Sequence, residues 1–211
     1  SPMSWGSWML IIFFPLATLQ ALIVNERWLE GFSLVNRIIQ PSKKHLNLIA
    51  MINVHMGAGI GVYTGILLST FYARPIWSSS ILGFVFLMSG LSSAAALVML
   101  MAPRREKLMF SKMDIYFISL EGFATTLFII GGITGSENVR DAMYFLISGP
   151  YAPWFWVVFV MGGMIVPLML ETLEAIGRIR FTVLVPLLVL TGSLTLRFII
   201  VYAGQAFPTF A

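Results

Sequence analysis

Three polar side chains lie on one side of an apolar stretch between residues 112 and 134. Asp114, Glu121 and Thr125 are spaced i, i+7 and i+11, which places them on one face of a helix. An ionised carboxyl group is costly among apolar residues. A glutamate in the middle of such a stretch is therefore protonated, paired, or part of a route for protons. Two interpretations of Glu121 stay open. It is either a step in a proton path that includes Asp114, or a protonated side chain that holds neighbouring helices together.

A second group of candidate residues, His55 and Tyr63, belongs to the apolar stretch 47–72. Eight residues of helix separate the two by about 80° around the axis and about 12 Å along it. Both can therefore face one cleft, where a phenol can donate and accept a hydrogen bond. The alternatives are a histidine that is hydrogen-bonded inside the bundle and a tyrosine that lies at the membrane interface.

Two arginines are predicted to be structural charges. Arg197 lies inside the apolar stretch 181–203 and needs an anion, a carbonyl group or water as its partner. Glu137 and Asp141 are candidate anions for it. Arg74 immediately precedes Pro75, after the stretch that carries Tyr63.

The elements that must position these residues are transmembrane helices. The protein has 211 residues, of which 58% are hydrophobic and only 10% charged, too few charges to cover a soluble domain. Apolar runs of about 20 residues match the ~30 Å hydrocarbon core of a bilayer, and only helices satisfy their backbone there in such runs. We therefore predict an all-α integral membrane protein with six transmembrane helices, at residues 5–24, 47–72, 79–101, 112–134, 154–173 and 181–203.

Positive charge is unevenly distributed over the loops. Ten Lys and Arg residues fall on one side of the predicted helices, and only Arg74 and Arg140 fall on the other. The positive-inside rule places the rich side in the cytoplasm, so both ends of the chain are predicted to lie on the outer side. The ten are Arg27, Arg37, Lys43, Lys44, Arg104, Arg105, Lys107, Lys112, Arg178 and Arg180.

A short internal sequence repeat suggests how the helices are grouped. "SPMSWGSW" near the start and "GPYAPWFW" at 149–156 both combine a proline with paired tryptophans, and "VYTG" is matched by "VYAG". Parallel repeats are common in membrane folds. We therefore assign 1–72 to the second half of a first bundle and 73–211 to a second four-helix bundle, with two further helices expected ahead of Ser1. Gly57, Gly61, Gly65 and Ser69 form a small-residue seam for close helix packing.

The sequence has no cysteine and two histidines, His45 and His55. Without cysteine it cannot bind an iron–sulfur cluster through thiolates, and two histidines in these positions do not make the usual axial pair of a transmembrane haem. We expect neither haem, nor iron–sulfur cluster, nor metal site in this protein.

Several segments together resemble the NrfD/PsrC-like (polysulfide reductase-type) membrane subunits. They are "SPMSWGSW", "YTGILLSTFYARPIW", "ISLEGF", "GPYAPWFWVVFVMGGMIVPL" and "LRFIIVYAGQ", which follow one another over nearly the whole sequence. The resemblance implies a fold of eight or more helices in two four-helix bundles. The family tyrosine associated with quinone stands eleven residues before an Arg-Pro pair, as Tyr63 does here.

The resemblance also implies a function. It points to a quinone-interacting anchor of a multisubunit respiratory oxidoreductase in the prokaryotic cytoplasmic (inner) membrane. Such an anchor exchanges electrons between membrane quinone (menaquinone or ubiquinone) and an iron–sulfur, ferredoxin-like subunit on the outer face. Through that subunit it reaches a catalytic subunit of the molybdopterin type or a multihaem cytochrome. Tyr63 and His55 are then the quinone-binding candidates, and Asp114 and Glu121 a proton path. The alternative is a secondary transporter or ion-translocating subunit without a quinone site.

Overall fold

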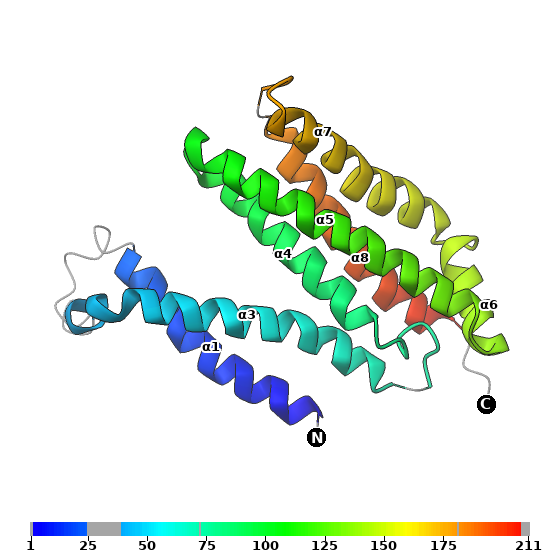
Figure 1. The fold of residues 1–211 in the computed structure, drawn as a ribbon. Coiled ribbons are helices and arrows are strands. Elements are labelled where there is room, and N and C mark those ends of the chain that lie inside the picture. The colour runs from blue at the N-terminus through cyan, green and yellow to red at the C-terminus, as the bar shows by residue number, and fades with distance from the viewer. Residues whose placement is uncertain (1, 25–38, 72, 181, 208–211) are drawn as a thin grey trace. The chain divides into compact units, whose positions relative to one another are not determined.

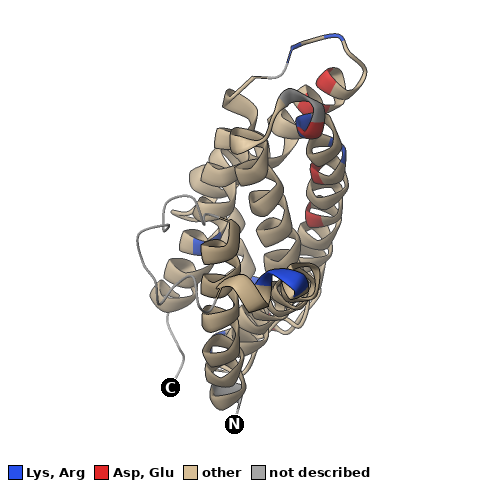
Figure 2. Cartoon of the chain, turned by 90° about the vertical axis from the view of Figure 1, so that its left-hand side faces the viewer, with Lys and Arg blue, Asp and Glu red and all other residues tan. Residues whose placement is uncertain are grey.

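The computed structural model describes residues 2–24, 39–71, 73–180 and 182–207 of the protein. Within these ranges the secondary structure is helical and contains no strand (Figure 1). The predicted all-α fold is therefore confirmed. Charged residues are sparse along the helices, as the predominance of tan in Figure 2 shows.

Within the described ranges, six helices are long and apolar enough to cross a membrane, as predicted. The prediction placed most of their ends within a few residues. Two starts differ: the second span begins at Ile39 rather than 47, and α5 (Arg104–Ile133) begins eight residues before the predicted start at 112. The six spans are Ser4–Val24, Ile39–Ser69, Leu82–Met101, Glu106–Ile133, Trp154–Ala175 and Leu184–Ala206.

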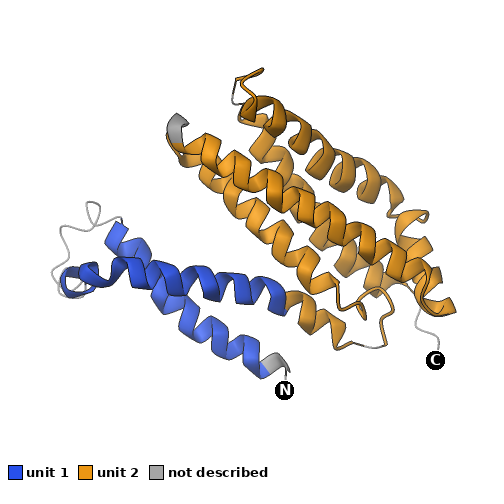
Figure 3. Cartoon of the chain, in the orientation of Figure 1, with its two compact units in different colours: residues 1–63 blue, residues 64–211 orange. Residues whose placement is uncertain are grey.

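The protein divides into two compact units, residues 1–63 and 64–211 (Figure 3). The division falls inside α3 (Leu46–Ser69), so the end of this helix belongs to the second unit. Unit 1 contains α1 (Pro2–Val24), the short 3₁₀ helix η2 (Lys43–His45) and most of α3.

In unit 1, α1 and α3 pack as an antiparallel pair. Their contacts run in opposite order along the two helices, and Ile23, Ile39 and Ile49 form a small core at one end. An interhelical hydrogen bond from Asn53 Nδ2 to Gln20 Oε1 (2.6 Å) adds a polar contact. The further contacts are Gly57 with Phe13, Gly59 with Met9, and Tyr63 with Gly6.

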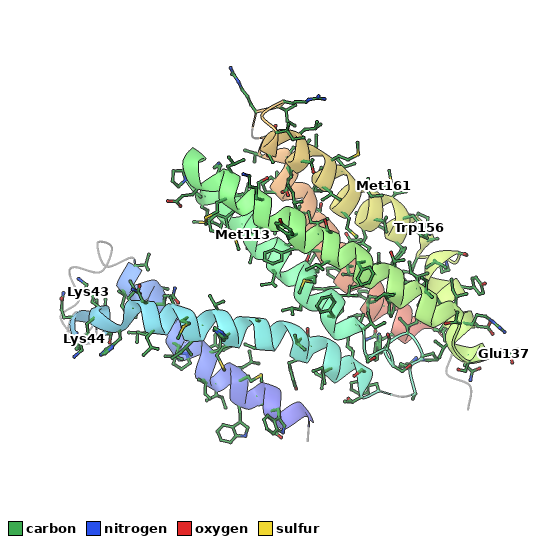
Figure 4. The ribbon with its side chains drawn as sticks, in the orientation of Figure 1. Lys43, Lys44, Met113, Glu137, Trp156 and Met161 are labelled. Carbon is green, nitrogen blue, oxygen red and sulfur yellow. The ribbon has the colours of Figure 1, made fainter. Side chains whose placement is uncertain are left out.

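In its described part, unit 2 contains the end of α3, four long helices that pack in a ring, and a short helix at one end of the ring. The ring is α4 (Leu82–Met101), α5, the continuous helix formed by η3 (Trp154–Ile165) and α7 (Val166–Ala175), and α8 (Leu184–Ala206), in that order of neighbours. The short α6 (Glu137–Ile147) packs its apolar side against them, and Ala142, Met143 and Leu146 are buried there. Large side chains such as Trp156 and Met161 lie on the outside of the ring (Figure 4).

The helix η3–α7 changes its winding along its length. Residues Trp154–Ile165 form a π-helix (η3), and Val166–Ala175 form a regular α-helix (α7). The change falls just before Pro167, which has no N–H to donate and disturbs the α-helical pattern around it. Gly163 of η3 lies directly against Gly192 of α8, so close that neither position has room for a methyl group.

Candidate functional site

The buried face of α5 carries the three polar residues that the sequence singled out. Asp114, Glu121 and Thr125 are all buried inside unit 2. About 10 Å of helix separates Asp114 from Glu121, at 1.5 Å per residue. The ring of helices therefore encloses a column of polar groups in an otherwise apolar interior.

Glu171 joins this column from α7. It is fully buried, and its carboxyl group is close enough to that of Asp114 for the two to interact electrostatically. Ser92 of α4 approaches Asp114 as well. Within the described residues, neither oxygen of either carboxyl group has a hydrogen-bond partner, and the buried hydroxyl groups of Ser92 and Ser111 have none either.

These unsatisfied atoms restrict the charge that the pair can carry. Two adjacent ionised carboxylates in an apolar interior repel each other and are poorly solvated. A proton held by the pair removes much of that cost, and buried polar atoms of this kind are normally satisfied by water or an ion. The group around Asp114 and Glu171 is thus chemically suited to take up and release a proton.

Glu121 lies further along the column, beside a second polar group. Ser89 Oγ of α4 donates a hydrogen bond to Ser193 Oγ of α8 (2.9 Å). Arg197 reaches both residues: its Nη1 donates to Ser193 Oγ and to the Ser193 carbonyl oxygen (2.9 Å), and makes a longer contact with Ser89 Oγ (3.4 Å). The guanidinium also lies near the Phe86 ring, 5.7 Å from its centroid, and interacts electrostatically with Glu121.

The partners of Arg197 therefore differ from those considered from the sequence. Glu137 and Asp141 are exposed residues of α6, whereas the described hydrogen bonds of the guanidinium go to hydroxyl and carbonyl oxygens inside the ring. Gly90 of α4 leaves room for it, since a methyl group there would come 3.6 Å from Nη2. Arg197 places a positive charge next to the buried end of the column.

Glu174 lies at the opposite end of the column. Its Oε1 accepts a hydrogen bond from the backbone N–H of Thr182 (2.9 Å), in the segment that joins α7 to α8. The other oxygen, Oε2, is buried and has no partner among the described residues. Acidic side chains thus extend from this loop, through Glu171 and Asp114, to Glu121.

Arg74 serves the structure of unit 2. Its Nη1 donates to three carbonyl oxygens at the end of α8, those of Gly204 (3.3 Å), Gln205 (3.0 Å) and Phe207 (3.2 Å). A positive charge at the C-terminal end of a helix is favourable because the last carbonyls have no partner within the helix. Nearby, Trp77 Nε1 donates to Ile200 O (2.8 Å), and its ring covers Gly204 so closely that a methyl group would not fit.

Tyr63 lies on the side of α3 that α1 covers. Its ring is partly buried, and it rests against the buried Gly6 of α1. His55 has a different environment, because it is exposed and its Nδ1–H donates to Met51 O one turn earlier (2.8 Å). The expectation that both residues face one cleft stays a prediction; what the structure shows is an exposed histidine and a tyrosine packed on a glycine.

The glycines of α3 do not line one helix interface. Gly65 lies against Gly83, at the start of α4, so closely that a methyl group would overlap its backbone. Gly57 has only an ordinary contact with α1, since a methyl group added there would come 3.9 Å from Phe13. The predicted seam is therefore divided between two neighbouring helices, and among these contacts close approach is limited to Gly65.

Two parts of the site are hard to find from the sequence alone. Glu171 lies near the end of a predicted helix, which gives it little weight, yet it is fully buried beside Asp114. Its spacing of three residues from Glu174, on the inner side of one helix, is the signal that could have identified it. The Ser89–Ser193 pair carries no such signal, because isolated serines are common in membrane helices.

Comparison with known proteins places this protein in a family. The family described as "Polysulphide reductase, NrfD" matches residues 1–209. Protein NrfD of Escherichia coli is 30% identical over 197 residues, which cover 87% of this chain and 61% of that protein. The NrfD homolog of Haemophilus influenzae is 28% identical over 210 residues, covering 94% of this chain and 64% of the relative.

A third relative is the C subunit of polysulfide reductase from Wolinella succinogenes, which is 28% identical over 226 aligned residues, 98% of this chain and 70% of that protein. The sequence thus spans between 61% and 70% of the length of these curated relatives. No solved structure matches it significantly. Because the family match extends over nearly every residue, this chain belongs to the NrfD polysulphide reductase family of multi-pass membrane proteins.

Proposed function

We propose that the protein is the quinone-interacting membrane subunit of a multisubunit respiratory oxidoreductase. In this role it exchanges electrons between membrane quinone and an iron–sulfur partner subunit. The observation that carries the proposal is the family match over residues 1–209, together with a relative named as one lettered component of polysulfide reductase. A protein named in this way works as part of an assembly.

The electron carriers are assigned to the partner subunits. The sequence has no cysteine, and within the described residues no group of three or more His, Cys, Asp and Glu residues could hold a metal ion. Iron–sulfur clusters are held by cysteine thiolates. A ferredoxin-like subunit on the outer face, and behind it a molybdopterin or multihaem catalytic subunit, would complete the path of electron transfer.

Tyr63 is the residue proposed to bind the quinone head group. Quinone carries two electrons and two protons in its reduced form, quinol. In its oxidised form, it has two carbonyl oxygens that accept hydrogen bonds. The Tyr63 ring rests on Gly6, which leaves room for it that a methyl group would fill. Its phenol can donate to a carbonyl oxygen and accept from a hydroxyl group, which fits a site that serves both quinone and quinol. His55, exposed on α3, is proposed as the second contact.

The acidic column of unit 2 is proposed as a proton route. It rests on Asp114 and Glu121, to which Glu171 adds a third buried carboxyl group. Proton transfer over the ~10 Å between Asp114 and Glu121 needs intermediate groups or water. The unsatisfied hydroxyl groups of Ser92 and Thr125 offer positions for that water.

The topology belongs to the same proposal. The ten-to-two asymmetry of Lys and Arg supports loops with Arg178 and Arg180 in the cytoplasm. Both ends of the protein then lie on the outer side of a prokaryotic inner membrane. Residues 1–72 would belong to one helical bundle and residues 73–211 to another, within an eight-helix fold; the ring of four helices in unit 2 supports the second assignment.

The proposal is tested by purifying the protein with its natural partners. An affinity tag is placed on it in its native host, the membranes are extracted with a mild detergent, and the co-purifying subunits are identified by mass spectrometry. We expect a stoichiometric iron–sulfur protein with a visible cluster absorbance. A protein that purifies alone under conditions that preserve other respiratory complexes would contradict the proposal.

An ion-translocating subunit without a quinone site is the second candidate. The observation that favours it is the column of buried carboxyl groups beside Arg197, which resembles the ionisable pathways of transporters. The two candidates differ in one property. A transporter reconstituted alone in liposomes moves protons or another ion down a gradient, whereas an electron-transfer subunit needs quinol and an electron acceptor.

A further inference from the structure

Among the unit 1 glycines whose surroundings the structure describes, Gly6 leaves the least room for a side chain, because the Tyr63 ring lies against it. Gly6 is buried on α1, and the Tyr63 ring of α3 lies directly over it. A methyl group on Gly6 would overlap Cε1, Cζ and Oη of the tyrosine. Those atoms are the end of the side chain that carries the hydroxyl group. We propose that Gly6 is a positioning residue that sets the location of the Tyr63 hydroxyl in the quinone site; this rests on the proposed function.

Helix stability gives no reason for glycine at this position. Gly6 lies in the first turns of α1 (Pro2–Val24), and glycine is among the weakest helix formers, well below alanine. Its φ angle is not positive, since Gly177 is the only glycine with positive φ among the described residues. The contact with Tyr63 is therefore what requires a residue without a side chain here.

The other glycines of this helix pair provide a contrast. A methyl group on Gly59 would come no closer than 3.9 Å to Met9, and one on Gly57 no closer than 3.9 Å to Phe13. Both are ordinary van der Waals distances. Among these three glycines, the requirement for a residue without a side chain is thus specific to Gly6, under the tyrosine ring.

The contact also indicates what a substitution would do. The overlapped atoms belong to the far end of a side chain rather than to a backbone, so in Gly6→Ala the ring moves while the helices keep their places. Hydrogen bonds weaken steeply with distance and angle, and small displacements of a reacting group reduce rates strongly. The expected effect of Gly6→Ala is a misplaced hydroxyl in a folded protein.

A double-mutant cycle separates placement of the hydroxyl from packing. Wild type, Gly6→Ala, Tyr63→Phe and the double variant are each purified as the complete complex. Phenylalanine keeps Cε1 and Cζ, so the overlap with alanine persists in the double variant, while the hydroxyl is absent. Three quantities are measured. They are the kcat and KM for quinol and the Kd of a hydroxyquinoline N-oxide, an aromatic quinol analogue whose fluorescence reports its binding. Gly59→Ala is the matched control on α3.

We expect Tyr63→Phe to weaken analogue binding about 2- to 10-fold, the range of one neutral hydrogen bond. Gly6→Ala should weaken it by a similar factor, and the double variant should be no weaker than Tyr63→Phe alone. The thermal stability of Gly6→Ala and of Gly59→Ala should stay close to wild type, and Gly59→Ala should bind the analogue normally.

The results that overturn the inference differ from those that overturn the proposed function. If Gly6→Ala weakens binding equally with and without the Tyr63 hydroxyl, or has no effect while Tyr63→Phe does, Gly6 does not act through the hydroxyl. Failure of Gly6→Ala to assemble would show that the contact supports the fold, which also refutes the positioning role. If Tyr63→Phe itself binds the analogue and turns over quinol as wild type does, the quinone role of Tyr63 is wrong.

Discussion

Three buried carboxyl groups distinguish the interior of unit 2 from that of an ordinary apolar bundle. Asp114, Glu121 and Glu171 are buried within a ring of membrane helices, and most of their oxygen atoms have no described partner. Evolution rarely leaves ionisable groups at such positions without a use, because they are expensive in the bilayer. A proton route would use all three, whereas the structural alternative is that these groups hold neighbouring helices together through contacts such as those of Asp114 with Glu171 and Ser92.

Glu121→Gln tests that route. The amide has nearly the same shape but cannot exchange a proton, so quinol turnover in detergent should remain within about twofold of wild type. Proton translocation by the complex in liposomes should fall by about tenfold or more, because one step of the route is removed. A pH-sensitive dye trapped in the liposomes measures it.

Glu106→Gln is the matched control for this experiment, since Glu106 is exposed at the start of the same helix. It should leave both activities unchanged. Translocation in Glu121→Gln equal to that of wild type would assign Glu121 to helix packing instead.

Arg74 illustrates a side chain whose role needs the three-dimensional structure. The sequence shows only an arginine before a proline, and its three acceptors lie about 130 residues away at the end of α8. Asp114 and Glu121 were identifiable because a seven-residue spacing within one helix is a local pattern. The same limit applies to Glu171 and to the serines beside Arg197, which come from other helices and meet only through tertiary packing.

Arg74→Ala should destabilise unit 2. It removes charged hydrogen bonds to the carbonyls that end α8, so we expect a loss of about 1.5–3 kcal/mol. Thermal unfolding in detergent, followed by circular dichroism, measures it, and Arg140→Ala on the exposed side of α6 is the control. A melting temperature of Arg74→Ala equal to that of Arg140→Ala would refute the capping role.

At the scale of helices, close packing depends on paired glycines. Gly163 and Gly192 face each other across η3 and α8, with backbone against backbone. The overlapped atoms are backbone atoms, which cannot move aside as a flexible side group does, so Gly163→Ala must push the helices apart. We expect a cost of about 1–3 kcal/mol, as for other overpacked interiors, read from the thermal unfolding of the complex.

Gly131 provides the control for that substitution. It lies on α5 with nothing within 4 Å of a methyl group, so Gly131→Ala should be neutral or stabilise the protein by up to about 1 kcal/mol. Equal effects of the two substitutions would mean that the contact between the glycines contributes nothing.

The helices were predictable to a large extent, and for a simple reason. Runs of about 20 apolar residues have few alternatives in a membrane, so the number and type of the membrane-length helices in the described ranges followed from hydrophobicity alone. The ends were less predictable: α5 begins at Arg104 because a charged first turn can still be helical outside the apolar core. The π-helix Trp154–Ile165 has no comparable signal, since its residues are as apolar as those of any membrane helix.

For the whole molecule, the distribution of charge predicts the orientation of the helices across the membrane. Arg178 and Arg180 belong to the loop between α7 and α8, which should face the cytoplasm, and the segment after α8 should lie outside. A periplasmically active phosphatase fused after Ala211 should be active, and the same enzyme inserted after Arg178 should be inactive. The reverse pattern would invert the proposed topology and place the quinone site on the other side.

The most direct test of the account is electron exchange between quinone and the iron–sulfur partner in the purified complex. Anaerobic quinol is added to the oxidised complex, or quinone to the reduced complex, and the cluster absorbance is followed by stopped flow. The account predicts exchange in at least one direction, and a rate lowered about 2- to 10-fold by Tyr63→Phe, because one hydrogen bond worth about 0.5–1.5 kcal/mol is lost. Clusters that dithionite reduces but that exchange no electrons with quinol or quinone would contradict it.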